Sequence, residues 1–214
     1  MHRVLTPELL DTLSPETPEA RRSRRDLRYI NAIMGNERWY RQVLPPLVRQ
    51  GERVLELGAG DGELCARLRC EIPNMDGIDR CPAPANWPAQ ARWHQVNLLA
   101  FHGWGDYPVV IGNLIFHHFD KSALGVIGES LRPHTRVLVA CEPARYRRYQ
   151  RLFALLCVCM RASPVTRHDG HVSIAAGFQV DELPELLGLD PDIWRWRTLA
   201  ARFGAYRLIA ERRG

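Results

Sequence analysis

The chain has 214 residues, of which 46% are hydrophobic and 25% charged, and its formal net charge is +5. This composition is that of an ordinary globular protein, and the length suffices for a core of its own, so we expect a single domain over residues 1–214. No apolar run has membrane-spanning length, no signal-peptide core is visible, and the six cysteines lack zinc spacing. We therefore expect a cytoplasmic protein with reduced thiols.

Residues 1–49 are predicted to form a helical cap. Thr17 or Ser14 can cap a helix in which apolar residues recur at helical spacing, and Gly35 can end it. The run Arg21–Arg25 is basic, and we interpret it as a solvated helix face. A weak contact of this run with an anionic membrane surface or a partner protein stays open.

A short apolar strand, Val54–Leu57, leads into three glycines at alternate positions, Gly58, Gly60 and Gly62. Glycine lacks a Cβ and tolerates positive φ, so such a loop can cradle a closely packed ligand. The spacing excludes the dinucleotide fingerprint G-x-G-x-x-G, whose third glycine would stand where the chain has Glu63. The segment predicts a strand, a ligand-binding loop and a helix.

The next predicted strand ends in a carboxylate. In a parallel βαβ unit the carboxyl ends of both strands meet at one edge, so Asp79 should lie beside the glycine loop. Its distance along the chain from Glu56 is close to the roughly 20 residues typical of an acid that binds ribose in nucleotide folds. A carboxylate there can accept both hydroxyl hydrogens of a ribose.

Further strands follow in order. A candidate strand ends near Asn97, and a continuous apolar run that ends at Asn113 is typical of a strand buried on both faces. A fifth strand is expected at 136–141 and a long helix at about 144–161, followed by a polar loop and a short helix. Two closing strands, Ile193–Leu199 and Ala205–Ala210, should pair as an antiparallel hairpin.

The pattern E-x-G-x-G-x-G at Glu56–Gly62 resembles the first motif of class I S-adenosylmethionine (SAM)-dependent methyltransferases, and the resemblance covers about 50–145. It implies a Rossmann-like, doubly wound α/β fold: a seven-stranded, mostly parallel sheet with an antiparallel C-terminal hairpin and N-terminal helical cover. Residues 50–142 would form the SAM-binding core, and 143–214 the long helix, a substrate loop and the closing strands.

The resemblance also implies SAM as cofactor and S-adenosylhomocysteine (SAH) as product. Asp79 would bind the ribose and Asn97 the adenine, where the family commonly has Asp, although an Asn carbonyl can also accept the hydrogen bond. The residues that we expect to bind the cofactor are Glu56, Gly58, Gly60, Asp61, Gly62, Asp79, Asn97 and Asn113.

The expected reaction is methyl transfer to a small molecule, with O-methylation of a phenolic or apolar metabolite as the leading hypothesis. Asn113 is not followed by the two prolines found in family members that methylate nucleic-acid or glutamine amino groups, so we expect neither DNA nor RNA as partner. Methylation of a protein or RNA, and SAM binding without catalysis, remain the alternatives. We expect a monomer or a homodimer.

A hydroxyl acceptor calls for a general base, for which histidine is the usual choice. The candidates for this base are His118, in the loop after the fourth strand, and His171, in the polar loop after the long helix. The residues that we expect to contact the substrate are Tyr40, Phe116, His117 and His168. No complete ligand set for a metal is apparent, so no metal is expected.

Overall fold

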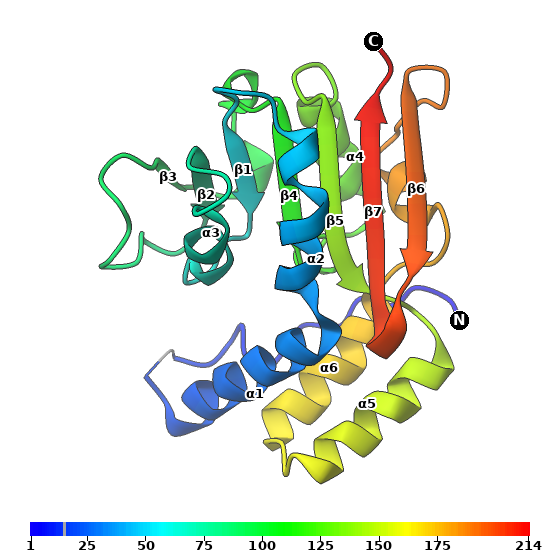
Figure 1. The fold of residues 1–214 in the computed structure, drawn as a ribbon. Coiled ribbons are helices and arrows are strands. Elements are labelled where there is room, and N and C mark those ends of the chain that lie inside the picture. The colour runs from blue at the N-terminus through cyan, green and yellow to red at the C-terminus, as the bar shows by residue number, and fades with distance from the viewer. Residues whose placement is uncertain (15) are drawn as a thin grey trace.

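The computed structural model describes residues 1–14 and 16–214. Seven strands form one sheet in the order β3-β2-β1-β4-β5-β7-β6, in which the first five are parallel and β7 is antiparallel to both of its neighbours (Figure 1). The strands are β1 (Val54–Leu57), β2 (Met75–Asp79), β3 (Trp93–Gln95), β4 (Val109–Asn113), β5 (Val137–Pro143), β6 (Trp194–Ala200) and β7 (Ala205–Arg212). The predicted doubly wound sheet with its C-terminal hairpin is confirmed.

Seven α-helices are seen in the described part of the chain. They are α1 (Pro18–Met34), α2 (Asn36–Val43), α3 (Glu63–Leu68), α4 (Lys121–Leu131), α5 (Arg147–Cys159), α6 (Pro164–Ala176) and α7 (Glu182–Leu186). Single 3-10 turns are η1 (Pro45–Leu47), η2 (Leu98–Ala100), η3 (Trp104–Asp106), η4 (Phe116–His118) and η5 (Arg202–Gly204). Helices α1, α5 and α6 gather at the carboxyl ends of the parallel strands (Figure 1). None of the helices in these residues has the length and apolar character needed to cross a membrane.

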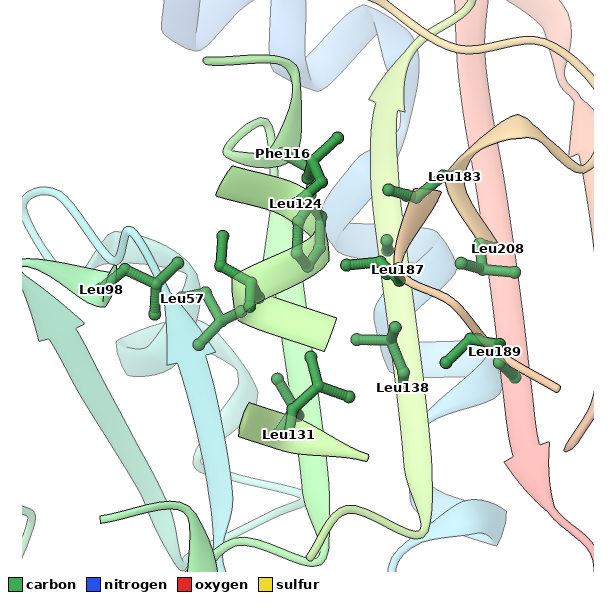
Figure 2. Packing of buried hydrophobic residues seen from close by; sticks show 14 of the residues in the cluster. Leu57, Leu98, Phe116, Leu124, Leu131, Leu138, Leu183, Leu187, Leu189 and Leu208 are labelled. Atoms are coloured by element: carbon green, nitrogen blue, oxygen red, sulfur yellow. The ribbon is translucent and has the colours of Figure 1, made fainter. Parts of the chain in front are cut away.

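Each face of the sheet has its own apolar core. Helices α2 and α3 cover one face, where Tyr40, Leu44 and Leu68 are completely buried. Helices α4 and α7 cover the other. Figure 2 shows this second core, with these residues labelled: Leu57, Leu98, Phe116, Leu124, Leu131, Leu138, Leu183, Leu187, Leu189 and Leu208. The central strands β1 and β5 are buried along their whole length, as their continuous apolar sequences require.

Local signals in the sequence set the ends of the first helix. The Thr17 hydroxyl accepts a hydrogen bond from the Ala20 amide, and Pro18 occupies the first turn. Gly35, at φ +67°, donates its amide to the carbonyls of Asn31 and Ala32 and ends the helix.

The prediction of a polar loop after the long helix is wrong. His168 and His171 lie on α6, which Ser163 caps by accepting a hydrogen bond from the Thr166 amide. Gly170 made the sequence resemble a turn, but here it permits close helix packing, because a Cβ at this position would lie 2.0 Å from the Phe153 ring of α5.

Candidate functional site

Two cavities adjoin at the carboxyl ends of the parallel strands. The larger has a volume of about 770 Å³ and the smaller about 410 Å³, and Gly58 belongs to the wall of both. These volumes are within the range of ligand pockets. Asp79 and Asn97 line the larger cavity, whereas Glu56 lines the smaller one. Six of the eight predicted cofactor residues therefore border the two cavities at this edge of the sheet, and Gly60 and Gly62 do not.

The glycine loop has the backbone conformation that its sequence requires. Gly58 and Gly60 have φ angles of +62° and +57°, which residues with a side chain rarely adopt. The Ile115 side chain packs over Gly58, where a Cβ would lie 2.5 Å from Ile115 Cδ1. Gly62 instead packs against Trp87 and lines neither of the two cavities. Its role in this structure is to bring the loop close to Trp87.

Asp79 is fixed by the backbone on both sides. Its Oδ2 accepts the Gly60 amide at 2.8 Å, and its Oδ1 accepts the Cys81 amide at 2.9 Å. Each carboxylate oxygen has a second lone pair, so both oxygens can still accept a ligand hydroxyl. The geometry fits the two neighbouring hydroxyls of a ribose.

Asn97 follows β3 in the chain and lines the larger cavity. Its Oδ1 accepts the Leu99 amide at 3.1 Å and so caps the turn η2. Four apolar residues line the same wall: Ile78, Val96, Leu98 and Leu99. Apolar side chains of this kind can pack against the faces of a flat aromatic ring. The site can accommodate an adenine, with Asn97 oriented by its own turn.

The smaller cavity combines acidic, amide and basic groups. Burial raises the pKa of Glu56 to about 7, although the Cys65 amide donates to its Oε2 at 3.1 Å. Asn113 Oδ1 accepts a hydrogen bond from Asn36 Nδ2 at 3.0 Å. Asp61 also belongs to this wall.

Helices α1 and α2 add residues to this cavity that the sequence did not single out. Asn31 lines it, and its buried Oδ1 has no hydrogen-bond partner among the residues described. Arg28 and Arg38 lie in the same wall. An unpaired buried acceptor beside basic side chains fits an amino acid moiety, whose ammonium donates and whose carboxylate accepts. No periodicity marks these positions, because their value depends on how the helices lie over the glycine loop.

A cluster of charged groups borders the larger cavity where β4 ends. His117 Nδ1 lies 2.6 Å from Glu142 Oε2 of β5, and His117 Nε2 lies 3.5 Å from Glu8 Oε1. Burial alone would lower the pKa of His117, but Glu142 and Glu8 together raise it to about 9. The neighbouring His118 ring lies against that of His117, tilted by 35°, with centroids 4.3 Å apart. Burial and the charge of His117 lower the pKa of His118, whose side chain remains 30% exposed.

The N-terminal segment covers this cavity, which the sequence did not predict. Leu5, Pro7 and Glu8 belong to its wall. Arg3 anchors the segment by donating to the carbonyls of Ala176 at 2.7 Å and Phe119 at 2.8 Å. Farther along, the amides of Leu9 and Leu10 donate to the Asp169 carboxylate of α6 at 2.7 and 3.0 Å.

Four of the residues expected to contact the substrate or to act as the base line neither cavity. Tyr40 is completely buried under the sheet, where its hydroxyl donates to the Gly112 carbonyl at 2.7 Å, and Phe116 lies in the opposite core. His171 is exposed against Gln150 of α5, and His168 lies beside Asp169 on the same helix. Of α6, it is Val172, Ser173 and Ala176 that line the larger cavity, so we assign the two histidines no role in the site.

Neither the family models nor the curated proteins include a match to the chain. Solved structures do resemble it. The plantazolicin methyltransferase BamL, in complex with a triazolic desmethylPZN analogue and SAH, matches with a TM-score of 0.70 at 10% identity, over 95% of this chain and 93% of BamL. The plantazolicin methyltransferase BpumL in complex with SAH gives 0.67 at 12% identity, over 92% of each chain.

A third match is PhzM, a pyocyanin biosynthetic protein, with a TM-score of 0.62 at 17% identity. The match covers 97% of this chain and 62% of PhzM. Identities this low bear on architecture and not on substrate. The sheet order, the glycine loop and these structures together establish that the chain has the class I SAM-dependent methyltransferase fold.

Proposed function

We propose that this protein transfers a methyl group from SAM to the hydroxyl group of a small phenolic or apolar molecule. The observation that carries the proposal is that Asp79, Asn97 and His118 line the same cavity. A cofactor held by the first two residues would therefore lie in the same enclosure as a group able to accept a proton.

The residues present fit SAM. Asp79 would hold the ribose and Asn97 the adenine, with Gly58 beneath the ligand. In the smaller cavity, Glu56 and the unpaired Asn31 Oδ1 would face the methionine ammonium. Bound SAM supplies an electrophilic sulfonium methyl group, so the protein has chiefly to position a nucleophile in line with it.

His118 would act as the general base. A phenol has a free pKa of about 10, so at neutral pH it benefits from a group that takes its proton. The lowered pKa of His118 keeps its imidazole neutral and able to accept that proton. His117 would instead orient the loop, because Glu142 and Glu8 hold its ring from both sides.

The acceptor would occupy the rest of the larger cavity. The apolar residues in this part of the wall, apart from those assigned to the adenine, come from three separate segments: Leu5, Pro7, Leu114, Ile115, Phe119, Val172 and Ala176. Such a lining favours an aromatic or aliphatic body over a highly charged one. The N-terminal segment, tied down through Arg3 and Glu8, would exclude water from the reacting groups.

The test is an SAH-release assay on the purified protein with a panel of phenols and hydroxylated apolar molecules. We expect turnover with at least one acceptor, and we expect His118→Gln to lower kcat at least tenfold while SAM affinity holds. His171→Gln, on the exposed side of α6, is the matched control and should retain full activity.

Other outcomes distinguish the alternatives. Methylation confined to protein or RNA substrates would replace the small-molecule proposal, and SAM binding without any methylated acceptor would favour a non-catalytic role. The basic run Arg21–Arg25 gives little support to a macromolecular partner, because two of its side chains are engaged within the chain. Arg21 pairs with Glu16, and Arg22 donates to the Arg161 carbonyl at 2.7 Å.

A further inference from the structure

We propose that Glu8, His117 and His118 form a binding site for a divalent transition-metal ion, preferentially zinc, on the wall of the larger cavity. Each residue offers one ligand atom, and the three atoms lie within 4.8 Å of one another. Two imidazoles and one carboxylate are a donor set that suits zinc or ferrous iron better than magnesium or calcium.

The spacing is close to what a bound ion needs. Zinc holds nitrogen and oxygen ligands at about 2.0–2.2 Å, so a tetrahedral site separates them by roughly 3.3 Å. Glu8 Oε1 and His117 Nε2 are already 3.5 Å apart. His118 has a ligand atom within 4.8 Å of both, and its side chain is 30% exposed.

Hydrogen bonding fixes which nitrogen of His117 faces the site. Glu142 Oε1 accepts the amides of Ile115 and Phe116, both at 2.9 Å, and its Oε2 lies 2.6 Å from His117 Nδ1. A carboxylate cannot donate, so Nδ1 carries a proton and donates it to Glu142. A carboxylate that orients a histidine in this way is typical of the surroundings of metal ligands.

The proton on Nδ1 determines what Nε2 of the His117 ring can do. With Nδ1 protonated, the Nε2 lone pair of neutral His117 points at the Glu8 carboxylate, and two acceptors face each other. A cation must lie between them for the contact to be favourable. A proton on Nε2 meets this need, and so does a metal ion, which would displace that proton.

The three residues supply three ligands, and all three line the larger cavity. This arrangement leaves a fourth position open to the cavity, as in catalytic zinc sites. If the proposed function holds, a bound ion would lower the pKa of an acceptor hydroxyl in this position, whose proton would pass to solvent water in the open cavity. His118 would then serve as a ligand and not as the base.

The experiment is isothermal titration of the full-length, tag-free, EDTA-treated protein with ZnCl₂ at neutral pH in two buffers of different ionisation enthalpy. We expect one ion per chain, with proton release. Glu8→Gln and His118→Gln should each weaken binding at least tenfold, and Glu142→Gln about 10–100-fold. His171→Gln is the control and should bind as the wild type does.

Cysteines are the competing zinc ligands, because Cys70, Cys81 and Cys159 are exposed. Titration with Co²⁺ separates the two cases, since thiolate ligands add a charge-transfer band that nitrogen and oxygen ligands lack. Stoichiometric binding without that band supports the site. No saturable binding, or binding that Glu8→Gln and His118→Gln both leave unchanged, would overturn it.

Folding and cofactor binding are checked separately. Glu8→Gln and His118→Gln change side chains at the cavity wall, and circular dichroism should confirm that they fold. SAM titration of the metal-free protein then distinguishes the two proposals. SAM binding without zinc binding removes only the metal site, whereas zinc binding without SAM binding removes the proposed function.

Discussion

Asp79 offers the sharpest test of the cofactor site. Its two oxygens hold the Gly60 and Cys81 amides at 2.8 and 2.9 Å, and each has one lone pair left for a ribose hydroxyl. A hydrogen bond to a charged group contributes about 1.5–3 kcal/mol, which corresponds to roughly 10–150-fold in affinity. We expect Asp79→Ala to raise the Kd for SAM at least tenfold in a calorimetric titration. Asp192→Ala, at an exposed turn before β6, is the control.

Losing Asp79 also releases the glycine loop, so the ribose contact needs a test of its own. A double-mutant cycle with SAH and 2′-deoxy-SAH provides it. Removing the 2′ hydroxyl should weaken binding to the wild type and have little further effect on Asp79→Ala. If the deoxy ligand loses the same factor with both proteins, Asp79 does not contact the ribose. A folded Asp79→Ala variant that binds SAM within twofold of wild type would refute the assignment altogether.

Three further predictions concern pH and packing. SAM affinity should fall as the pH drops below about 7, by up to about tenfold per unit, because protonation of Glu56 removes the charge that faces the ammonium; calorimetry on Glu56→Gln should give a flat profile. Tyr40→Phe should lower the free energy of unfolding in urea by about 1–3 kcal/mol, since the buried Gly112 carbonyl loses its partner, while SAM affinity stays unchanged. On α4, Gly128→Ala should lower the free energy of unfolding by about 1–3 kcal/mol, because the added Cβ would lie 2.0 Å from the Leu187 carbonyl oxygen. Gly125→Ala, where the added Cβ meets open space, should raise it by about 0.5–1 kcal/mol. Equal effects of the two substitutions would refute this packing argument.

The sequence predicted the sheet edge well, for a physical reason. Strand β1, the glycine loop and Asp79 are specified by local pattern and by the rule that parallel strands end at one edge. Pro82, Pro84 and Pro88 account for the irregular connection between β2 and β3, where the structure has no helix over 80–92.

The surroundings of this edge were harder to predict. His168-Asp169-Gly170-His171 has the composition of a turn, but tight packing against α5 makes it a helix. Tyr40 lies on an amphipathic helix, and periodicity alone cannot distinguish a residue in the core from one in a pocket. Glu8 reaches His117 and Ser173 across the fold, and no local signal announces such a long-range contact.

Calorimetric titration of the wild-type protein with SAM, and separately with SAH, shows whether the edge of the sheet at the glycine loop binds this cofactor. We expect saturable binding of each ligand at one site per chain. Binding of neither ligand to the folded protein would contradict it, and the glycine loop would then serve a different ligand on the same fold.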